Sequence, residues 1–371
     1  MTKNQYIKEI NELGQSIWYD NLSLDVLRSG ELKRLLDCGV SGLTSNPTIF
    51  KKAIADTSHY DEKIAQLAQE GGDADQICET LMIDDVGAAA DLLRETYENT
   101  QGRDGYASIE VSPKLAHDVQ GTVAAAVRLW KRLQRPNIMI KIPATDAGID
   151  AIEQVLSKGI NVNVTLIFSC NVYTRVANAY INALQNLDDA QRNAISSVAS
   201  FFVSRVDSIV ERELTKKKAE LGPSMEQFIG TVGIANSKCA YQRFQEIFSE
   251  SAFTRYGEQG ARVQRPLWAS TGTKNPDFSP VLYVEELIGA ETVNTLPPQT
   301  LNSLLEHATV RETITTAPEA ATTLLENLAQ VGVNLEALLE ELQRDGVEAF
   351  VQSYEELIAA VEQKRSQLTA A

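Results

Sequence analysis

The most informative segment of the chain reads Ile138-Met139-Ile140-Lys141-Ile142-Pro143-Ala144-Thr145. Its apolar residues predict a buried β-strand, in which successive side chains point to opposite faces. Lys141 therefore shares a face with Met139, while three isoleucines occupy the other face. Burying a lysine as a cation costs free energy unless the charge is paired, and the same desolvation makes a neutral amine nucleophilic. This strand alone leaves two interpretations open: a structural salt bridge, or a lysine that forms a Schiff base with a carbonyl substrate.

Two neighbouring strands also carry polar residues on a single face. In residues 106–111, Glu110 shares its face with a serine, and in residues 161–166, Asn163 and Thr165 alternate with apolar residues. A carboxylate suits the role of acid/base partner or counter-ion for a buried amine. Amide and hydroxyl groups suit a hydroxylated substrate or a positioned water. A buried structural hydrogen-bond network is the alternative for each strand, but the agreement of three strands favours a functional site.

Short β-type runs recur between helical stretches along the chain, which predicts parallel strands joined by crossover helices. Eight such strands close a (β/α)8 TIM barrel, the α/β fold that we predict. We expect residues 1–298 to form the barrel, with two or three helices inserted at about 47–104 and further helices at about 206–262. Residues 299–371 are expected to form a C-terminal helical extension packed on the barrel; a dimer surface is the alternative. The predicted strands are Gln15 to Tyr19, Gly39 to Leu43, Tyr106 to Val111, Ile138 to Ile142, Val162 to Phe168, Val198 to Val203, Pro266 to Ala269 and Thr292 to Thr295.

Composition and charge restrict the class of protein. The 371 residues are 43% hydrophobic and 23% charged, which is typical of soluble globular proteins. A formal net charge of −16 has the wrong sign for non-specific binding to nucleic acid or anionic membranes, so neither partner is expected. The sequence lacks an apolar signal segment and any run long enough to span a membrane, which predicts a cytoplasmic location.

Cysteine and histidine usage gives no indication of a metal site. The four cysteines lie far apart, and the three histidines have no second ligand at metal-binding spacing. Walker A and Gly-x-Gly-x-x-Gly motifs are also missing from the sequence, so nucleotide binding has no support.

Further candidate residues follow the predicted strands, where the mouth of a barrel lies. A carboxylate ends the first strand, hydroxyl and amide groups follow the second, and cations follow the sixth and seventh, where barrels often bind phosphate. A helix-capping loop and a solvated arginine are the alternatives for the cations. The candidates for substrate contact or catalysis are Asp20, Thr44, Asn46, Ser200, Arg205, Ser270 and Lys274.

Three segments resemble motifs of the transaldolase family, the Schiff-base transferases of the pentose phosphate pathway. Thr44-Ser45-Asn46-Pro47 resembles the family's N-terminal signature, and Lys141 to Thr145 with Gly148 resembles its Schiff-base segment. Residues 159–166 are similar to its asparagine-rich strand. The resemblance covers the predicted barrel from Asp20 to the Ser270 loop in the family's order, and the chain resembles the longer bacterial variety.

The resemblance implies a catalytic cycle without a metal or cofactor. Lys141 would attack the C2 carbonyl of sedoheptulose 7-phosphate or fructose 6-phosphate, and Asp20 would take the C4 hydroxyl proton as the C3–C4 bond breaks. Glu110 would serve the proton transfers of imine formation through a water held by Thr165. The dihydroxyacetone unit would then pass to glyceraldehyde 3-phosphate or erythrose 4-phosphate.

The resemblance also implies binding roles. Asn46, Asn163 and Ser200 would hold hydroxyl groups of the dihydroxyacetone unit, and Arg205 a phosphate. Many members carry an arginine two residues beyond the serine matching Ser270, but Gly272 occupies that position here, and Lys274 is the alternative cation.

Several alternatives remain open at this stage. A related aldolase would release free dihydroxyacetone, and a non-catalytic barrel would only bind sugar phosphates. A carboxylate at Glu110 favours transfer, and a buried amine would be unnecessary for binding alone. Both a monomer and a homodimer are compatible with the sequence.

Overall fold

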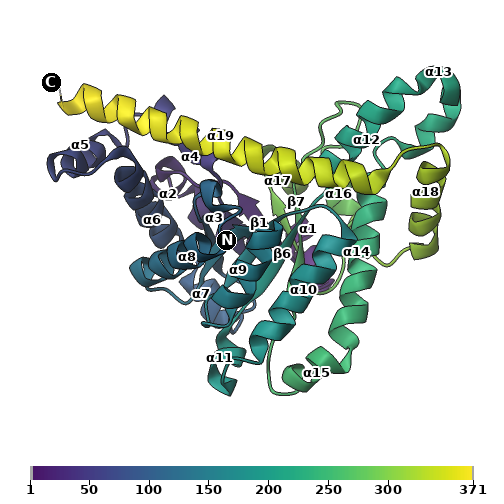
Figure 1. Ribbon diagram of the computed structural model, residues 1–371, viewed down its shortest axis with the longest axis horizontal. Helices are drawn as coiled ribbons and strands as arrows, with labels where there is room; N and C mark the ends of the chain where they lie inside the picture. Colours follow the sequence, from purple (N-terminus) through teal and green to yellow (C-terminus); the bar gives the residue numbers. More distant parts are fainter. Residues whose placement is uncertain (1–2, 370–371) are drawn as a thin grey trace.

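The computed structural model describes residues 3–369 and contains one closed barrel of eight parallel strands (Figure 1). The strands follow one another around the barrel in sequence order, and β1 pairs with β8 to close it. The predicted (β/α)8 fold is therefore confirmed. The strands are β1 (Gln15–Asp20), β2 (Gly42–Thr44), β3 (Tyr106–Glu110), β4 (Ile138–Pro143), β5 (Val162–Ile167), β6 (Ser197–Phe202), β7 (Arg265–Ala269) and β8 (Thr292–Leu296).

Helices cover the outside of the barrel and fill the long connections. The first half of the chain contains α1 (Gln5–Glu12), α2 (Leu24–Arg28), α3 (Glu31–Cys38), α4 (Pro47–Asp56), α5 (Asp61–Gln69), α6 (Ala74–Leu92), α7 (Arg94–Asn99), the 3-10 helix η1 (Pro113–Leu115), α8 (Val119–Leu133), α9 (Asp146–Leu156) and α10 (Cys170–Leu184). The second half contains α11 (Asp189–Ala194), α12 (Ser204–Lys216), α13 (Lys218–Leu221), the 3-10 helix η2 (Gly222–Phe228), α14 (Val232–Ser249), α15 (Ser251–Gly257), α16 (Leu282–Glu285), α17 (Pro298–Glu306), α18 (Pro318–Gln330) and α19 (Leu335–Thr369).

The second crossover differs in two details from the expectation. It holds four helices, α4 to α7, rather than two or three. Strand β2 begins at Gly42 and not at Gly39, because Gly39 has a φ of 110° and ends α3. Its backbone N–H donates to carbonyls of that helix, so this residue cannot take part in the strand ladder.

The middle of the barrel interior is apolar. Trp18, Met139, Val198, Leu267 and Val293 point inward from five different strands and are buried. Side chains fill the interior of an eight-stranded barrel, so this layer is a packed core and not a pore. It separates polar groups at the amino ends of the strands from those at the carboxyl ends.

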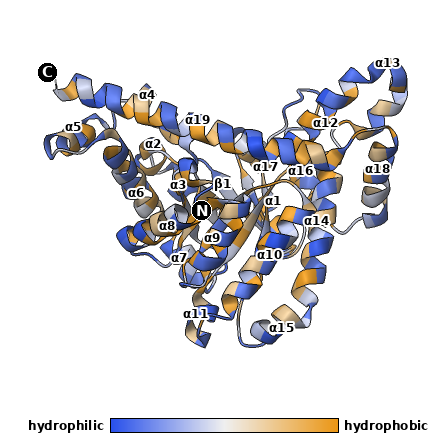
Figure 2. Ribbon diagram, in the orientation of Figure 1, coloured by the Kyte–Doolittle hydropathy of each residue, from blue (hydrophilic) through white to orange (hydrophobic). Residues whose placement is uncertain are grey.

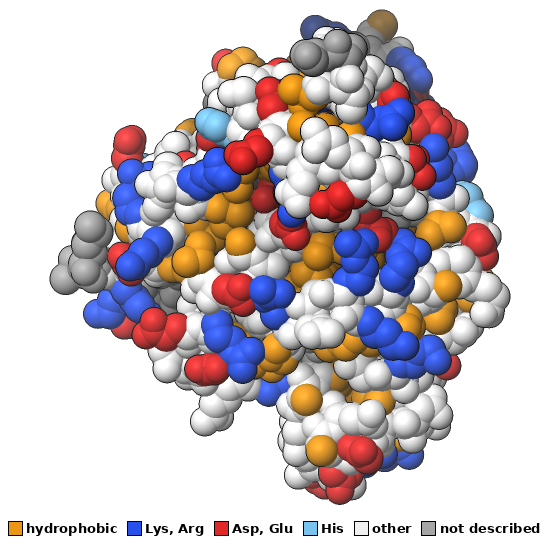
Figure 3. Space-filling view, turned by 90° about the vertical axis from the view of Figure 1, so that its left-hand side faces the viewer, with side chains coloured by type: hydrophobic (Ala, Val, Ile, Leu, Met, Phe, Trp, Pro, Cys, Tyr) orange, Lys and Arg blue, Asp and Glu red, His pale blue; other side chains and the backbone are white. Residues whose placement is uncertain are grey.

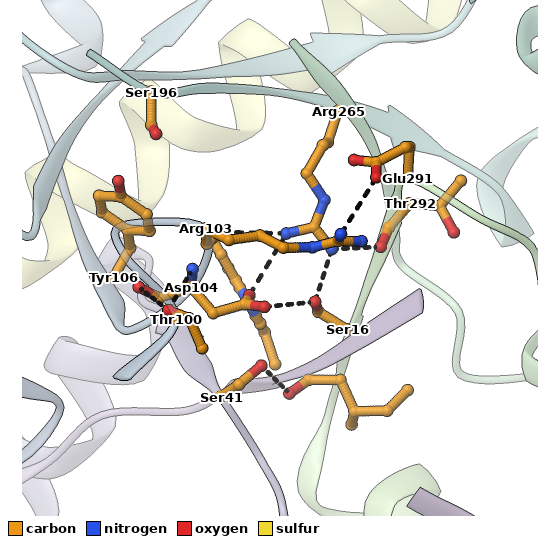
Figure 4. Close-up of polar contacts among 12 residues, drawn as sticks. Ser16, Ser41, Thr100, Arg103, Asp104, Tyr106, Ser196, Arg265, Glu291 and Thr292 are labelled. Carbon is orange, nitrogen blue, oxygen red and sulfur yellow. Dashed lines mark hydrogen bonds and ion pairs between the residues drawn. The ribbon is translucent and has the colours of Figure 1, made fainter. Parts of the chain in front are cut away.

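A buried ion pair closes the amino-terminal end of the barrel (Figure 4). The Asp104 carboxylate lies 3.4 Å from a guanidinium nitrogen of Arg265, and both side chains are nearly inaccessible. Asp104 also accepts hydrogen bonds from the Ser16 hydroxyl (2.6 Å) and the Trp18 indole (2.8 Å). Arg265 donates to the Thr292 carbonyl (2.7 Å). We name this cluster the barrel floor.

The long helix α19 crosses the carboxyl ends of the strands, and its sequence alternates between apolar and polar residues (Figures 1 and 2). It packs against α4, α5, α6, α12 and β5. Its buried residues include Leu338, Leu339 and Leu342, which the sequence places on one apolar face. The division of the chain near residue 298 stays a prediction.

Ion pairs fasten α19 along its length. Glu356 pairs with a lysine of α4 (2.6 Å), Glu341 with an arginine of α12 (2.8 Å), and Lys364 with Asp61 (2.5 Å). On the face that includes α5, acidic and basic side chains are intermingled (Figure 3). Among residues 3–369, no helix is both long enough and apolar enough to cross a membrane.

Candidate active site

Lys141 and Glu110 form a buried ion pair at the carboxyl ends of β4 and β3. The two residues are register partners, and Nζ of Lys141 lies 2.5 Å from Oε1 of Glu110. The side chains are only 8% and 6% exposed. Nζ also donates a hydrogen bond to the carbonyl oxygen of Ser45 (2.9 Å). The structure thus places the predicted nucleophile and the predicted acid/base group in direct contact.

Asp20 lies at the end of β1 on the same side of the barrel. Its Oδ1 accepts a hydrogen bond from the Thr44 hydroxyl (2.7 Å), and Thr44 lies 2.8 Å from the hydroxyl of Thr295 on β8. Burial raises the pKa of the Asp20 carboxyl, and the nearby Lys141 ammonium opposes this rise. Burial likewise raises the pKa of Glu110, again against the influence of Lys141. Both carboxyl groups are therefore more easily protonated than exposed ones.

A chain of neutral hydrogen bonds joins β3, β5 and β6 beside this pair. The Ser200 hydroxyl donates to Oδ1 of Asn163 (2.7 Å), whose amide donates to the Ser108 hydroxyl (3.1 Å). All three residues are buried. Asn46 is half-buried and caps α4, because its Oδ1 accepts the Ile49 backbone N–H (3.1 Å). Its side-chain NH2 group has no acceptor among residues 3–369.

Thr165 has a buried hydroxyl without a hydrogen-bond partner in the described chain. A cavity of about 10 Å³ lies between Thr165, Glu110 and Lys141 and is roofed by Val347 and Phe350 of α19. This volume approaches the room that one water molecule needs. The arrangement therefore allows one water to bridge the hydroxyl and the carboxylate.

The predicted cations differ in their surroundings. Arg205 lies in the first turn of α12, is half-buried over the ring of Phe202 (5.4 Å), and has no acidic partner among residues 3–369. Burial lowers the pKa of its guanidinium. An unpaired, partly desolvated guanidinium near a barrel mouth is suited to an anionic ligand.

The two candidate residues in the loop after β7, Ser270 and Lys274, differ in their contacts. Ser270 has a φ of 56°, and its hydroxyl lies 2.9 Å from that of Ser204, which precedes Arg205. Lys274 is exposed and forms neither a hydrogen bond nor an ion pair with any residue from 3 to 369. The structure therefore links Ser270 to the Arg205 region but does not link Lys274 to it.

Comparison with known proteins identifies the family. The model of the Transaldolase/Fructose-6-phosphate aldolase family matches residues 17–361. The chain belongs to this family. Relatives named transaldolase come from Mycolicibacterium paratuberculosis (45% identical, covering 100% of this chain and 99% of the relative) and Thiobacillus denitrificans (44%, covering 95% and 99%). One named transaldolase 2 comes from Nostoc (43%, covering 97% of each chain).

Membership of the transaldolase family at this identity makes the chain an enzyme of the transferase class, as predicted. Within residues 3–369, no group of three or more His, Cys, Asp and Glu side chains is arranged to hold a metal ion. The absence of a metal and of an organic cofactor from the reaction stays a prediction.

Sequence reasoning missed several groups at this transaldolase-family site. The Ser45 carbonyl is a backbone acceptor, and the sequence gives no signal for such a contact beyond the turn that contains it. Thr295 had no clear signal either, because it directly follows Asn294 and the eighth predicted strand shows no regular alternation of polar and apolar residues. Phe350, whose ring centre lies 5.9 Å from Nζ of Lys141, comes from α19, and the sequence gives no signal that this helix reaches Lys141.

Proposed function

We propose that the enzyme transfers a dihydroxyacetone unit from a ketose phosphate to an aldose phosphate through a Schiff base on Lys141. Sedoheptulose 7-phosphate and fructose 6-phosphate are the proposed donors, and glyceraldehyde 3-phosphate and erythrose 4-phosphate the acceptors. The observation that carries the proposal is the buried Lys141–Glu110 contact of 2.5 Å beside Asp20. A nucleophilic amine and two carboxyl groups of raised pKa provide the groups that imine formation and aldol cleavage require.

Glu110 is proposed to manage the protons of imine formation. It takes a proton from the Lys141 ammonium, and the neutral amine adds to the C2 carbonyl of the donor. The carbinolamine hydroxyl then leaves as water after receiving a proton from Glu110. A water bound to the Thr165 hydroxyl relays this proton, which is consistent with the unpartnered hydroxyl and the adjoining cavity.

Asp20 is proposed to act in the cleavage step. Its carboxylate takes the proton of the C4 hydroxyl, the C3–C4 bond breaks, and the aldose phosphate leaves. The electron pair remains on the three-carbon unit, where the protonated imine on Lys141 stabilises it as an enamine. Transfer to the acceptor aldehyde reverses these steps, and Asp20 returns the proton to the new hydroxyl.

The remaining polar groups are proposed to bind substrate. Asn163 and Ser200, with the free amide of Asn46, would hold hydroxyls of the dihydroxyacetone unit. Arg205 would bind the phosphate, together with Ser270. Thr44 would orient Asp20 through the hydrogen bond of 2.7 Å. The proposed pathway is the non-oxidative pentose phosphate pathway, in the cytoplasm, and both monomer and homodimer remain compatible.

Borohydride reduction in the presence of fructose 6-phosphate tests the mechanism. We expect mass spectrometry to find the reduced adduct on Lys141 and none in the Lys141→Met variant. Lys158→Met is the matched control, because Lys158 is exposed in the loop after α9, and its adduct should equal that of the wild type. An active wild-type protein that yields no adduct would refute the Schiff-base mechanism.

A second pair of measurements separates the transferase from an aldolase. We expect rapid consumption of fructose 6-phosphate only when erythrose 4-phosphate is present, because the enamine stays on Lys141 until an aldehyde accepts it. Equal turnover without an acceptor, with release of free dihydroxyacetone, would identify an aldolase instead. In Asp20→Asn, the trapped adduct should carry six carbons rather than three, because imine formation precedes the step that Asp20 serves.

A further inference from the structure

Strand β5 contains a bulge directly beside Lys141. Val164 pairs with Ala199 and Ile167 pairs with Phe201, so β5 advances three residues while β6 advances two. The extra length falls at Thr165 and Leu166. Leu166 has a φ of 58°, in the left-handed region that favours glycine. A bulge of this kind re-aims the side chains around it.

The conformation of Leu166 needs support from its surroundings. A leucine with positive φ is strained, and such strain persists only where neighbouring structure holds the backbone in place. The ladder with β6 is interrupted at this point, whereas the ladder with β4 continues to Thr165, whose carbonyl accepts the Ala144 backbone N–H (2.8 Å). Leu166 itself receives further contacts from α19, which passes over β5.

Helix α19 makes two specific contacts at this point. The side-chain amide of Gln343 donates to the carbonyl oxygens of Ala144 (2.9 Å) and Leu166 (3.2 Å), which follow β4 and lie within β5. One turn further, Gly346 provides space for the Leu166 side chain, since a Cβ atom at this position would lie 3.0 Å from its Cδ2. One contact fixes the backbone of the bulge, and the other accommodates its side chain.

We infer that Gln343 and Gly346 are positioning residues for catalysis, because they hold the Leu166 bulge that aims the Thr165 hydroxyl at Lys141 and Glu110. The inference rests on the proposed function, in which Thr165 holds the water of imine formation. Helix α19 then has two roles: it covers the active site, and it holds the Leu166 bulge in position. Neither residue contacts the reacting atoms, so both act through Leu166 and Thr165.

The first test removes the amide donor without changing the size of the side chain. Gln343→Met should lower kcat about tenfold, since misplacement by 1 Å costs about a hundredfold and the bulge would move less than that. KM should change less than kcat, because the Gln343 side chain bonds only to the Ala144 and Leu166 carbonyls and to none of the proposed substrate-binding groups. The rate at which the Lys141 adduct forms should fall together with kcat. Gln352→Met is the matched control on the same helix, because Gln352 is exposed and bonds only to Glu356, and its kcat should be that of the wild type.

The second test separates positioning from stability. Gly346→Ala should leave the unfolding temperature close to that of the wild type, because the better helix propensity of alanine offsets the cost of the close contact, yet it should lower kcat by pushing on Leu166. Leu166→Gly accepts a positive φ without strain, so Gln343→Met should cost less kcat in that background. An unchanged kcat in both Gln343→Met and Gly346→Ala would overturn the inference. If the wild type forms no Lys141 adduct, the proposed function fails; if it does and the variants behave as the wild type, only the positioning role fails.

Discussion

The barrel floor allows a direct test of how burial determines the contribution of an ion pair to the stability of the protein. Two arginine–carboxylate pairs lie side by side there (Figure 4). Arg265 and Asp104 are 6% and 8% exposed, whereas Arg103 and Glu291 are 40% and 42% exposed at a distance of 3.1 Å. The same substitution, arginine to methionine, can be made in each pair. We predict that Arg265→Met destabilises the protein far more than Arg103→Met.

The expected sizes follow from the surroundings of the two pairs. Removing one partner of a buried pair leaves an uncompensated charge and costs about 3–5 kcal/mol, whereas an exposed pair is worth about 0–1 kcal/mol. The 371 residues imply an unfolding entropy of about 0.8 kcal/mol/K at the midpoint, from about 2.1 cal/mol/K per residue. Arg265→Met should therefore lower the unfolding temperature by about 4–6 °C, and Arg103→Met by about 1 °C or less.

Thermal unfolding followed by circular dichroism, at one scan rate for all variants, measures this difference. Adding Asp104→Asn to Arg265→Met should recover part of the loss, because the stranded carboxylate is removed. The kcat of folded Arg265→Met at 25 °C should equal that of the wild type, since the apolar layer separates the floor from the active site. If Arg265→Met and Arg103→Met lower the unfolding temperature equally, burial does not govern these pairs and the reasoning is wrong.

Two further predictions concern pH and phosphate binding. Burial raises the pKa of Asp207 from 3.8 to about 6, so folding favours the protonated acid. The protonated Asp207 side chain contributes its full stabilisation below the unfolded pKa, and this contribution is lost as pH rises to about 6. The unfolding temperature of the wild type, relative to that of Asp207→Asn, should therefore fall over this pH range and level off above it. A difference independent of pH would contradict this. Arg205→Met should raise the KM for fructose 6-phosphate about tenfold or more, since a hydrogen bond to a charged group contributes about 1.5–3 kcal/mol. Lys274→Met should change KM less, because Lys274 is exposed, and equal effects would refute the assignment of the phosphate to Arg205.

The barrel and much of its polar mouth could be predicted because both depend on a period of two. Alternation places Glu110, Lys141 and Asn163 on the inward faces of their strands, and parallel strands in sequence order bring these faces together. The register pairs Glu110 with Lys141 and Lys141 with Asn163, so neighbouring predicted residues became actual neighbours. The alternation within each strand was sufficient to predict these neighbours, because each strand of the barrel pairs with the next strand along the chain.

Contacts between remote segments could not be predicted in this way. Gln343 lies 177 residues from Leu166, and no periodicity in α19 indicates which turn meets the bulge. The left-handed backbone of Leu166 was equally hidden, because a leucine in an apolar strand normally predicts regular extended structure. The contact depends on how the final helix lies across the barrel, which tertiary packing decides.

The two ends of the barrel show why residue types alone do not separate structural from functional ion pairs. Asp104–Arg265 and Glu110–Lys141 are both buried pairs of an acid and a base inside the same barrel, with similar exposure. Yet the Asp104 carboxylate accepts hydrogen bonds from a hydroxyl and an indole in addition to its ion pair, while the Glu110 carboxylate contacts only Lys141 among the donors of residues 3–369. The Asp104 carboxylate therefore uses both oxygens in contacts with the protein, whereas the Glu110 carboxylate keeps acceptor capacity for a water or a substrate. The two pairs thus differ in the number of their further partners and not in burial, which is consistent with a structural role for the floor and with the proton transfer proposed for Glu110.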